Sequence, residues 1–294
     1  MSYKSGFVSI VGRPNVGKST LINELIGEKI AITSHRPQTT RNRIQAILNH
    51  DKGQIVFLDT PGIHKRNNKL DDFMLEQAYK SFEGVDLLIF LLDGSTYFGK
   101  GDDFIFRQLK GIKIPVLVVL NKIDKIEKNA LFRKIDEYKQ KTNKEIIPIS
   151  AIKGENIDTL LDEIFEYLPE GPQFYPEDMI TDQIEKFIVS EIIREKIFYL
   201  CREEIPYGVA ILVEEMKERN NGLFYIRANI YVEKKSHKGI IIGKNGARLK
   251  EIGKRARQDI EKLLNNDIYL DLWVKILKDW REKENLIKRM GYKE

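Results

Sequence analysis

The chain has a single cysteine, Cys201, in 294 residues. A disulfide within the chain is therefore excluded, as is the disulfide-rich scaffold of many small secreted domains. The longest apolar runs, at 87–92 and 114–120, are far shorter than the ~20 residues of a membrane-spanning helix and suit buried strands. Residues 1–6 lead into a strand that feeds a functional loop, which a cleaved signal peptide would remove. We therefore expect a cytoplasmic location.

Histidine is scarce, and the four residues lack the spacing of metal ligands: His35, His50, His64 and His237. No internal repeat and no low-complexity tract is present. We interpret the two tryptophans, Trp273 and Trp280, as core or interface residues rather than platforms on which bases stack.

The composition, with 42% hydrophobic and 32% charged residues, suits a globular protein with a real core. The net charge of +5 is unevenly divided. Residues 184–294 hold 24 basic and 18 acidic side chains, a net of +6, which leaves 25 basic and 26 acidic side chains in 1–183. Nine basic residues and one acidic residue lie between Lys234 and Arg257. This run indicates either a solvated helix face or contact with nucleic acid or membrane.

Short apolar segments alternate with helical patterns between residues 6 and 170. The strand candidates are Phe7–Val11, Arg43–Leu48, Gln54–Leu58, Asp86–Leu92, Val116–Leu120 and Ile146–Ile149. The helix candidates are Lys18–Ile26, Leu70–Phe82, Asp102–Leu109, Ala130–Lys139 and Ile157–Tyr167. This alternation predicts an α/β fold with a mainly parallel sheet and helices on both faces. Ligands of such sheets bind at the carboxyl ends of the strands.

The pattern changes at 169–176, where three prolines and a glycine predict a linker. The order then becomes helix–strand–strand–helix–helix–strand, with candidates at Ile184–Arg202, Val209–Met216, Leu223–Glu233, Lys238–Leu264 and Ile268–Leu277. The turn signal Asn220-Asn221-Gly222 predicts a hairpin between the first two strands. We predict an N-terminal domain at 1–170, a linker at 171–183 and an α+β domain at 184–294.

An eight-residue motif, G-x-x-x-x-G-K-S, lies between the first predicted strand and the first predicted helix. Its residues are Gly12, Arg13, Pro14, Asn15, Val16, Gly17, Lys18 and Ser19. The glycines let the backbone wrap phosphates, toward which N–H groups and the helix N-terminus point. We expect Lys18 to reach the β- and γ-phosphates and Ser19 to supply a hydroxyl to Mg²⁺. The motif in this context predicts a P-loop nucleotide site.

Two further segments are expected at the phosphate end of this site. The first follows the strand at 54–58 and consists of Asp59, Thr60, Pro61, Gly62 and then Ile63. Its acid suits a contact to Mg²⁺ through water, and the Gly62 N–H can meet a γ-phosphate. The second, Thr39-Thr40-Arg41, resembles the GTPase switch that senses γ-phosphate and Mg²⁺. By position we favour Thr40 over Thr39, and Lys18, Thr40 and Gly62 are the catalytic candidates.

The segment Asn121-Lys122-Ile123-Asp124 resembles the guanine-reading motif of GTPases. The Asp124 carboxylate can accept hydrogen bonds from N1–H and the 2-amino group of guanine, which adenine does not offer in that arrangement. A buried polar group left unpaired by the wrong base can discriminate by ~10⁴ or more. Lys122 would lay its stem along the base. Ser150-Ala151 resembles the last GTPase motif, although Ile152 stands where lysine is usual.

A G-x-x-G loop lies between the apolar stretch at 240–242 and a basic helical pattern. It is the signature of KH domains, in which the loop clamps the backbone of about four nucleotides. The element order after the linker resembles the bacterial type of KH fold. The RNA-binding candidates are Ile242, Gly243, Lys244, Asn245, Gly246, Arg248, Lys250 and Lys254.

Together, GRPNVGKS, the QTTR stretch at 38–41, DTPG, NKID and the G-x-x-G loop with its basic helix resemble the Era family of bacterial GTPases. The resemblance covers nearly the whole chain. It implies GTP or GDP and Mg²⁺ as ligands, GTP hydrolysis, and a role in small-ribosomal-subunit assembly. It also implies that a monomer binds the 3′ end of small-subunit ribosomal RNA, with peripheral contact to the inner membrane face in some members. The related double-GTPase factors have two G domains, whereas this chain has one.

Two other functions stay open: a nucleotide switch that barely hydrolyses GTP without a partner, and a membrane-surface GTPase whose basic domain binds anionic lipid. Many GTPases orient the attacking water with a glutamine directly after D-x-x-G, but Ile63 stands there. We therefore expect slow intrinsic hydrolysis. A potassium ion held partly by Asn15 or a bound partner would supply the missing charge, unless Asn15 only braces the loop.

Overall fold

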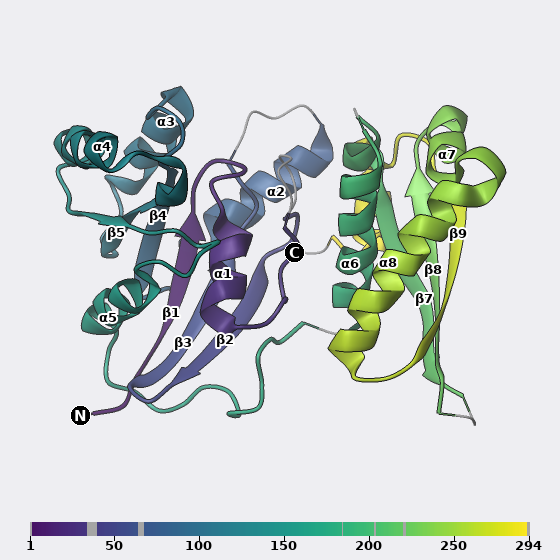
Figure 1. The fold of residues 1–294 in the computed structure, drawn as a ribbon, viewed down its shortest axis with the longest axis horizontal. Coiled ribbons are helices and arrows are strands. Elements are labelled where there is room, and N and C mark those ends of the chain that lie inside the picture. The colour runs from purple at the N-terminus through teal and green to yellow at the C-terminus, as the bar shows by residue number, and fades with distance from the viewer. Residues whose placement is uncertain are drawn as a thin grey trace. The chain divides into compact units, whose positions relative to one another are not determined.

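The structure is a computed structural model that describes residues 2–33, 40–63, 68–183, 185–202, 204–219 and 222–292. The chain divides into two compact units, 1–65 with 73–182 and 66–72 with 183–294. The first unit contains a six-stranded sheet and the second a three-stranded sheet (Figure 1).

The sheet of the first unit is mainly parallel, as predicted. Its strands are β1 (Lys4–Val11), β2 (Ile44–His50), β3 (Gly53–Asp59), β4 (Leu87–Asp93), β5 (Val116–Asn121) and β6 (Ile146–Pro148). They lie in the order β2-β3-β1-β4-β5-β6, and only the β2–β3 pairing is antiparallel. The antiparallel pair follows from the short connection at 51–52, because a parallel pair needs a crossover of a dozen or more residues.

Helices cover both faces of this sheet, which confirms the predicted α/β class. They are α1 (Lys18–Ile26), α2 (Lys69–Lys80), α3 (Lys100–Leu109), α4 (Lys128–Thr142) and α5 (Ile157–Tyr167), with a 3₁₀ turn η1 (Ile123–Lys125). Ala78, Ile105 and Tyr138 from α2, α3 and α4 pack in one cluster with Phe90 of β4. Figure 1 shows α1 and α2 on opposite sides of the sheet. All seven residues of β4 are buried, as expected of a strand covered on both faces.

The proline-rich segment after α5 is fastened to the edge of the first unit. Gln54 of β3 is fully buried, and its amide oxygen accepts a 3.0 Å hydrogen bond from the Tyr175 N–H. Its Nε2 donates to the Tyr175 carbonyl at 2.8 Å. Farther along, the Ile47 N–H donates to the Ile180 carbonyl at 2.9 Å. Composition predicted the end of the helix here, but not this strap along β2 and β3.

The second unit has the predicted order of helix, two strands, two helices and a strand. These are α6 (Glu185–Leu200), β7 (Ala210–Glu218), β8 (Phe224–Val232), α7 (Lys235–Ile242), α8 (Ala247–Leu264) and β9 (Ile268–Ile276). Strand β8 pairs antiparallel with β7 and parallel with β9. Asn220 and Asn221 of the predicted hairpin lie outside the described residues. The structure adds 3₁₀ turns η2 (Ile205–Gly208), η3 (Lys244–Gly246) and η4 (Trp280–Glu282), and helix α9 (Glu284–Arg289).

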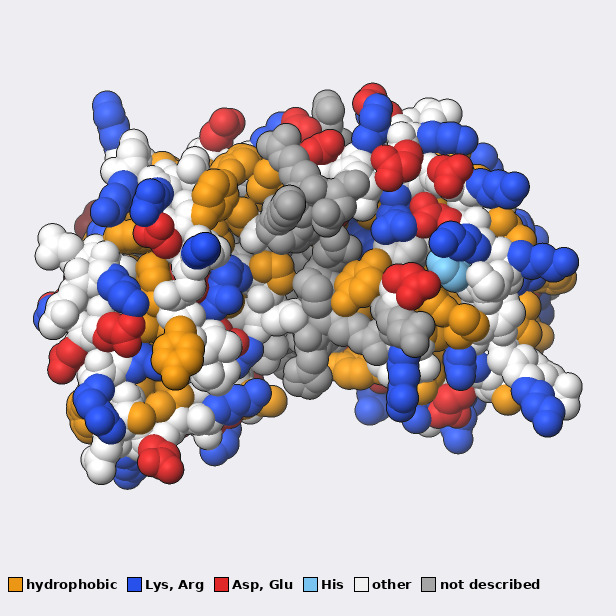
Figure 2. All heavy atoms as spheres, turned by 90° about the horizontal axis from the view of Figure 1, so that it is seen from above, with side chains coloured by type: hydrophobic (Ala, Val, Ile, Leu, Met, Phe, Trp, Pro, Cys, Tyr) orange, Lys and Arg blue, Asp and Glu red, His pale blue; other side chains and the backbone are white. Residues whose placement is uncertain are grey.

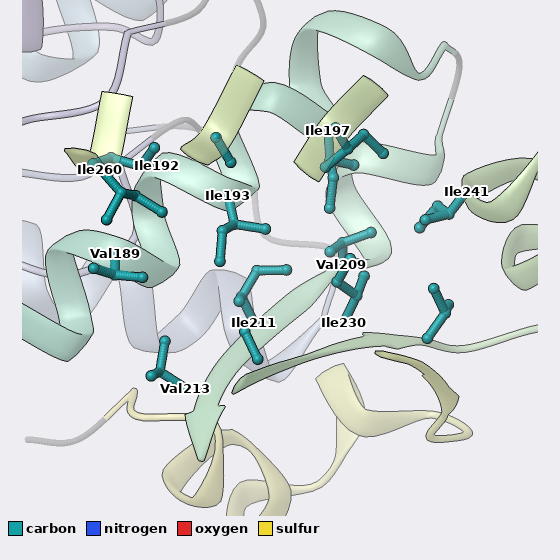
Figure 3. Packing of buried hydrophobic residues seen from close by; sticks show 14 of the residues in the cluster. Val189, Ile192, Ile193, Ile197, Val209, Ile211, Val213, Ile230, Ile241 and Ile260 are labelled. Atoms are coloured by element: carbon teal, nitrogen blue, oxygen red, sulfur yellow. The ribbon is translucent and has the colours of Figure 1, made fainter. Parts of the chain in front are cut away.

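Helices α6 and α8 bury one face of this sheet. Isoleucines from α6, α8 and the strands form a continuous cluster, and Figure 3 shows Ile193 of α6 directed toward Ile211 of β7. The apolar stripe of α6 is therefore core, as predicted. Trp280 is fully buried and its indole donates to the Gly208 carbonyl at 3.0 Å. Trp273 is 56% exposed, so of the two predicted alternatives, core or interface, Trp280 is core and Trp273 is not core.

Candidate active site and nucleic-acid interface

The P-loop connects β1 to α1, and its shape depends on close backbone approach. Gly17 has a φ of 106°, and a Cβ there would lie 2.2 Å from the Asn121 amide nitrogen. Glycine is therefore required. The same Asn121 side chain donates to the Val16 carbonyl at 2.9 Å and accepts from the Ala151 N–H at 3.0 Å. One side chain thus ties the P-loop to the two predicted base-contacting segments.

Lys18 lies inside the loop, and its ammonium group donates to the carbonyls of Gly12 and Arg13 at 3.3 and 3.0 Å. Burial lowers the pKa of Lys18 to about 8, although the nearby Asp59 carboxylate acts in the opposite direction. The carbonyl contacts only partly replace the water that Lys18 has lost. A phosphate oxygen is a stronger, charged partner for the same group.

Three oxygen-bearing side chains converge beside Lys18. The Ser19 hydroxyl lies 2.9 Å from the Thr40 hydroxyl and donates to Asp59 Oδ2 at 2.8 Å, and Thr40 donates to the same oxygen at 3.0 Å. Burial raises the pKa of Asp59, although Lys18 opposes this. Asp59 Oδ1 is buried and has no hydrogen-bond partner among the described residues. Hard oxygen donors with an unused buried acceptor fit Mg²⁺ held directly and through water.

The opposite end of the site is built by β5 and the segment after β6. Asp124 Oδ1 accepts a 2.7 Å hydrogen bond from the Ser150 hydroxyl, which fixes the carboxylate. The Lys122 ammonium donates to Asp93 Oδ2 at 2.6 Å and to the Asn15 carbonyl. Burial alone would raise the pKa of Asp93, but the hydrogen bonds from Lys122 and Ser95 and the charge of Lys122 lower it. The Lys122 ammonium group therefore links the base-reading segment to the P-loop and to the end of β4.

A single pocket joins both ends. Of the predicted nucleotide residues, those that line it are Pro14, Asn15, Gly17, Lys18, Ser19, Thr40, Gly62, Asn121, Lys122, Asp124 and Ala151. Four residues that we did not predict also line it: Thr20, Thr33, Lys125 and Ile152. Thr20 and Lys125 directly follow predicted motifs, so a wider window would have found them. Ile152 is 71% exposed and stands where the sequence departs from the usual lysine.

The other predicted nucleotide residues do not line this pocket: Gly12, Arg13, Val16, Asp59, Thr60, Pro61, Ile63, Ile123 and Ser150. Arg13 forms an ion pair with buried Asp102 at 2.7 Å. The Thr60 hydroxyl donates to the Ile10 carbonyl at 2.8 Å. Ile63 packs in the hydrophobic cluster of α2 and α3. Thr39, the alternative switch threonine, lies outside the described residues.

A second groove lies in the other unit, where the G-x-x-G loop joins α7 to α8. Its lining residues are Gly246, Leu249, Lys250, Gly253, Lys254, Arg257, Tyr269, Leu270 and Leu272. Gly243 has a φ of 72°, and a Cβ there would lie 2.8 Å from the Arg248 Cβ, so glycine is required. The groove therefore combines an open backbone loop, three cationic side chains and an apolar wall.

The predicted RNA residues divide between this groove and its surroundings. Gly246, Lys250 and Lys254 line it, and Lys244 and Asn245 are exposed on the loop. The Arg248 guanidinium instead donates to the Ile240 carbonyl at 2.7 Å, while Ile242 packs against the core. Arg257 was missed, although its spacing from Gly246, Lys250 and Lys254 follows one face of a helix. The groove residues of β9, which are Tyr269, Leu270 and Leu272, could be identified only once the structure showed where β9 lies.

Comparisons with known proteins agree with this architecture. A family model described as 50S ribosome-binding GTPase matches residues 7–122, and a KH domain model matches 204–281. GTPase Era of Halothermothrix orenii is 64% identical over 293 residues, which cover 100% of both chains. The chain belongs to the Era family of GTPases. GTPase Era of Staphylococcus haemolyticus is 52% identical over 291 residues, with 99% of this chain and 97% of its own covered.

Solved structures of Era match the whole fold. A variant of Aquifex aeolicus Era bound to GDP·AlF₄⁻ has a TM-score of 0.96 and 44% identity, covering 98% of this chain and 99% of its own. Era in complex with MgGDPNP and nucleotides 1506–1542 of 16S ribosomal RNA has the same TM-score and identity, covering 99% of each chain.

Two kinds of feature are absent from the described residues. No helix there is long and apolar enough to cross a membrane. No group of three or more histidine, cysteine or acidic side chains is placed to hold a metal ion in that part of the chain. Ser19 and Thr40, whose hydroxyl groups lie beside Asp59, are not of these residue types. Figure 2 shows many lysine and arginine side chains on the surface of the second unit.

Proposed function

We propose that this Era-family chain hydrolyses GTP to GDP and phosphate at the site in residues 1–170 and binds RNA through residues 184–294. The observation that carries the first activity is one pocket with Lys18 at its phosphate end and Asp124 at its base end. The RNA is the 3′ end of small-subunit ribosomal RNA, by analogy with the relative bound to nucleotides 1506–1542 of 16S ribosomal RNA. The cellular role is assembly of the small ribosomal subunit.

The phosphate end acts by charge and position, since phosphoryl transfer depends on both. Lys18 exchanges its contacts with Gly12 and Arg13 for β- and γ-phosphate oxygens. The Gly62 N–H, at the pocket wall, meets the γ-phosphate. Ser19, Thr40 and Asp59 hold the magnesium site. Mg²⁺ bound there neutralises charge that develops between the β- and γ-phosphates.

The base end selects guanine. Asp124 presents two carboxylate oxygens to the N1–H and the 2-amino group, and its hydrogen bond from Ser150 keeps that edge in place. The Lys122 stem and Ile152 border the pocket on the base side, so the ring contacts apolar atoms. A substrate lacking both donors would leave Asp124 with only its hydrogen bond from Ser150, and a polar site that loses its partners in this way discriminates strongly.

The groove of the second unit suits a single RNA strand. Lys250, Lys254 and Arg257 lie on one side, where they can meet phosphates, and Leu270 and Leu272 supply an apolar wall for bases. The loop from Gly243 to Gly246 allows a phosphate backbone to approach, because neither glycine carries a side chain. This supports RNA as the partner of the KH unit.

The GTPase proposal is tested with Lys18→Ala. We expect nucleotide binding or turnover to fall to background while the melting temperature stays near that of the wild type. Lys128→Ala, an exposed lysine at the start of α4 outside the pocket, is the matched control and should retain full turnover. Near-normal turnover by Lys18→Ala would overturn the assignment of the site.

The RNA proposal is tested with the double variant Gly243→Asp and Gly246→Asp in the full chain. Negative charge in the loop should abolish binding to the 1506–1542 RNA and leave GTP affinity unchanged. Gly111→Asp, at a site with open space around it, is the control. For the wild type, log affinity should fall with log salt by about 0.7 per phosphate neutralised on a single strand. Unchanged RNA affinity in the double variant would refute the assignment.

We propose that the protein acts in the cytoplasm and meets the inner membrane face only through its basic C-terminal unit. The basic excess of residues 184–294 supports attraction to anionic surfaces. Binding of the full chain to RNA and to anionic vesicles should be compared at one ionic strength. Tighter binding to vesicles, unaffected by the two aspartates in the loop, would instead support the membrane-surface function.

A further inference from the structure

The sheet of the second unit has a face opposite α6 and α8, and part of it is open. Ile268 and Val274 of β9 are buried in the core. Side chains alternate along a strand, so Tyr269, Asp271 and Trp273 lie on the opposite face. Tyr269 is 55% exposed and Trp273 is 56% exposed. Two large aromatic side chains exposed together on one face indicate an interaction surface for a ligand or a macromolecule.

These aromatic side chains are ordered by their neighbours. Tyr225 of β8 pairs in register with Tyr269, and their rings stack with centroids 6.0 Å apart and planes 12° apart. The Arg219 guanidinium lies 4.3 Å from the centroid of the Tyr225 ring. We name Arg219, Tyr225, Tyr269 and Trp273 the outer aromatic patch.

One carboxylate satisfies the polar atoms of this patch. Asp271 Oδ2 accepts hydrogen bonds from the Tyr225 hydroxyl at 3.2 Å and from the Trp273 indole at 2.9 Å. The Tyr225 and Trp273 rings are therefore held in position, while the Tyr269 and Trp273 side chains stay more than half exposed. A rigid sheet carrying stacked rings and a guanidinium plane has the features on which unpaired nucleobases stack.

We propose that the outer aromatic patch binds unpaired nucleobases of the same RNA strand that occupies the G-x-x-G groove. This inference rests on the proposed RNA-binding function and extends it to a second surface of the KH unit. The bases would stack on Trp273 and on the Arg219–Tyr225–Tyr269 group. The RNA site would then pass around strand β9 rather than end at the groove.

Continuity with the groove is the first argument for RNA as the occupant. Tyr269 belongs to the patch and also lines the groove, together with Lys254 and Arg257. Strand β9 is at the edge of the sheet, so no further strand separates the two surfaces. An RNA strand that leaves the groove past Tyr269 therefore reaches the patch directly.

The charge and extent of the open area are the second argument. Exposed cations on the strands around the patch are Lys217, Arg227 and Lys275, in addition to Arg219. Two carboxylates share this face with the four cations: Asp271 holds the two rings, and Glu215 pairs with Lys217 at 2.5 Å. Toward the other end of the same face, Asn229 and Tyr231 are buried. The open area is thus a small aromatic surface bordered by cations. It suits a few bases and phosphates better than a protein interface of standard size.

The test uses the full chain and nested truncations of the 1506–1542 RNA. Trp273→Ala and Tyr225→Ala should each weaken binding of the longest RNA by about 5- to 150-fold, the range that removal of one stacked base implies. Trp273→Phe keeps a ring and should stay within about threefold of the wild type. The matched control is Tyr199→Ala, which removes an exposed aromatic residue of α6 and should change nothing.

The truncations separate this inference from the RNA-binding function itself. The shortest RNA whose binding still depends on Gly243 and Gly246 should bind Trp273→Ala as tightly as the wild type. Equal affinity of wild type and both alanine variants for every RNA would overturn the inference. So would equal weakening on the shortest RNA, because the patch would then act through the groove.

Two further results would count against the inference. Normal RNA affinity of the alanine variants with loss of binding to intact small subunits would indicate a protein partner at the patch. If the wild type bound none of the RNAs, the proposed function would itself fail and the inference with it.

Discussion

The hydroxyl groups of Ser19 and Thr40 lie 2.9 Å apart, and both donate to one oxygen of Asp59. Ser19 belongs to α1, whereas Thr40 precedes β2. The P-loop helix and this segment therefore meet through these side chains. Because Thr40 is buried, its hydroxyl is committed to this cluster and is placed to report on an ion bound there.

Thr40→Ala should lower the rate of GTP hydrolysis by about 10²-fold, the typical cost of removing one group aimed at charge in the transition state. Thr40→Ser keeps the hydroxyl and should stay within a few-fold of the wild type. Single-turnover assays at saturating GTP and Mg²⁺ measure this. Equal rates for the alanine and serine variants would show that the hydroxyl has no part in hydrolysis.

Asp124→Asn should move base preference from guanine to xanthine. Asparagine presents one donor and one acceptor where guanine needs two acceptors, and xanthine offers the complementary edge. We expect GTP affinity to fall by ~10²-fold or more and xanthosine triphosphate to bind better than GTP. Competition binding on the same variant contains its own control, because improved xanthine binding excludes misfolding. An unchanged order of affinities would remove Asp124 from base reading.

The motifs named eleven of the residues that line one pocket, because the shape of each motif is set locally. The eight-residue P-loop motif sets the positions of Lys18 and Ser19 at the start of α1 without reference to distant parts of the chain. Ile152, like Thr20 and Lys125, directly follows a predicted motif, whereas the place of Thr33 in the pocket depends on how the chain between α1 and β2 folds. Such long-range placement leaves no pattern within a short window of sequence.

The KH unit shows the same limit. Its element order followed from periodicity, and Trp280 was correctly interpreted as core. Trp273 is not core, because side chains alternate along β9 and the covered face takes buried Ile268 and Val274 with partly buried Leu270 and Leu272. The alternation of side chains along β9 could be read from the sequence, and it places Trp273 on the opposite face from those residues. Only the structure shows that the part of that face around Trp273 is exposed to solvent.

Gln54→Ala should loosen the strap at 169–182 from the first unit. The substitution leaves the N–H groups of Phe174 and Tyr175 without their acceptor, at a cost of about 1–3 kcal/mol in unfolding free energy. Chemical denaturation and limited proteolysis of this segment measure the effect. Gln108→Ala, an exposed residue of α3, is the control. Protease resistance equal to that of the wild type would show that other contacts hold the strap.

Binding of GTP should take up a proton at alkaline pH. The lowered pKa of Lys18, about 8, means that much of this group is neutral in the free protein at pH 8.5. The triphosphate favours the ammonium form, so the pKa rises on binding and a proton is taken up. Affinity should therefore decline from pH 7 to pH 9.5, by up to tenfold per pH unit above pH 8.

Calorimetry in buffers of different ionisation enthalpy measures this uptake directly. At pH 8.5 the apparent binding enthalpy should depend on the buffer, and at pH 7 the Lys18 contribution should vanish because the group is already charged. A buffer-independent enthalpy at pH 8.5 would mean that Lys18 keeps its proton in the free protein.

Hydrolysis without a partner should be slow and faster in potassium than in sodium. Ile63, which follows the D-x-x-G segment, is buried in the core and cannot orient a water molecule. The site therefore needs another source of positive charge near the bond that breaks. Asn15 lines the pocket and stands at a φ of 65°, which turns the loop at this point. A cation held partly by its side chain could offset charge between the β- and γ-phosphates, as an arginine finger does in other GTPases.

The measurement is GTP turnover by the wild type and Asn15→Ala at one ionic strength, in potassium and then in sodium. We expect the wild type to be faster in potassium by about an order of magnitude. The Asn15→Ala variant should show no difference and match the sodium rate of the wild type, which would also show that the loop still binds nucleotide. A potassium effect that survives in Asn15→Ala would place the ion elsewhere. Equal wild-type rates in both salts would leave activation by bound RNA or ribosome as the source of the missing charge. That source would suit a GTPase that must hydrolyse only when its partner is in place.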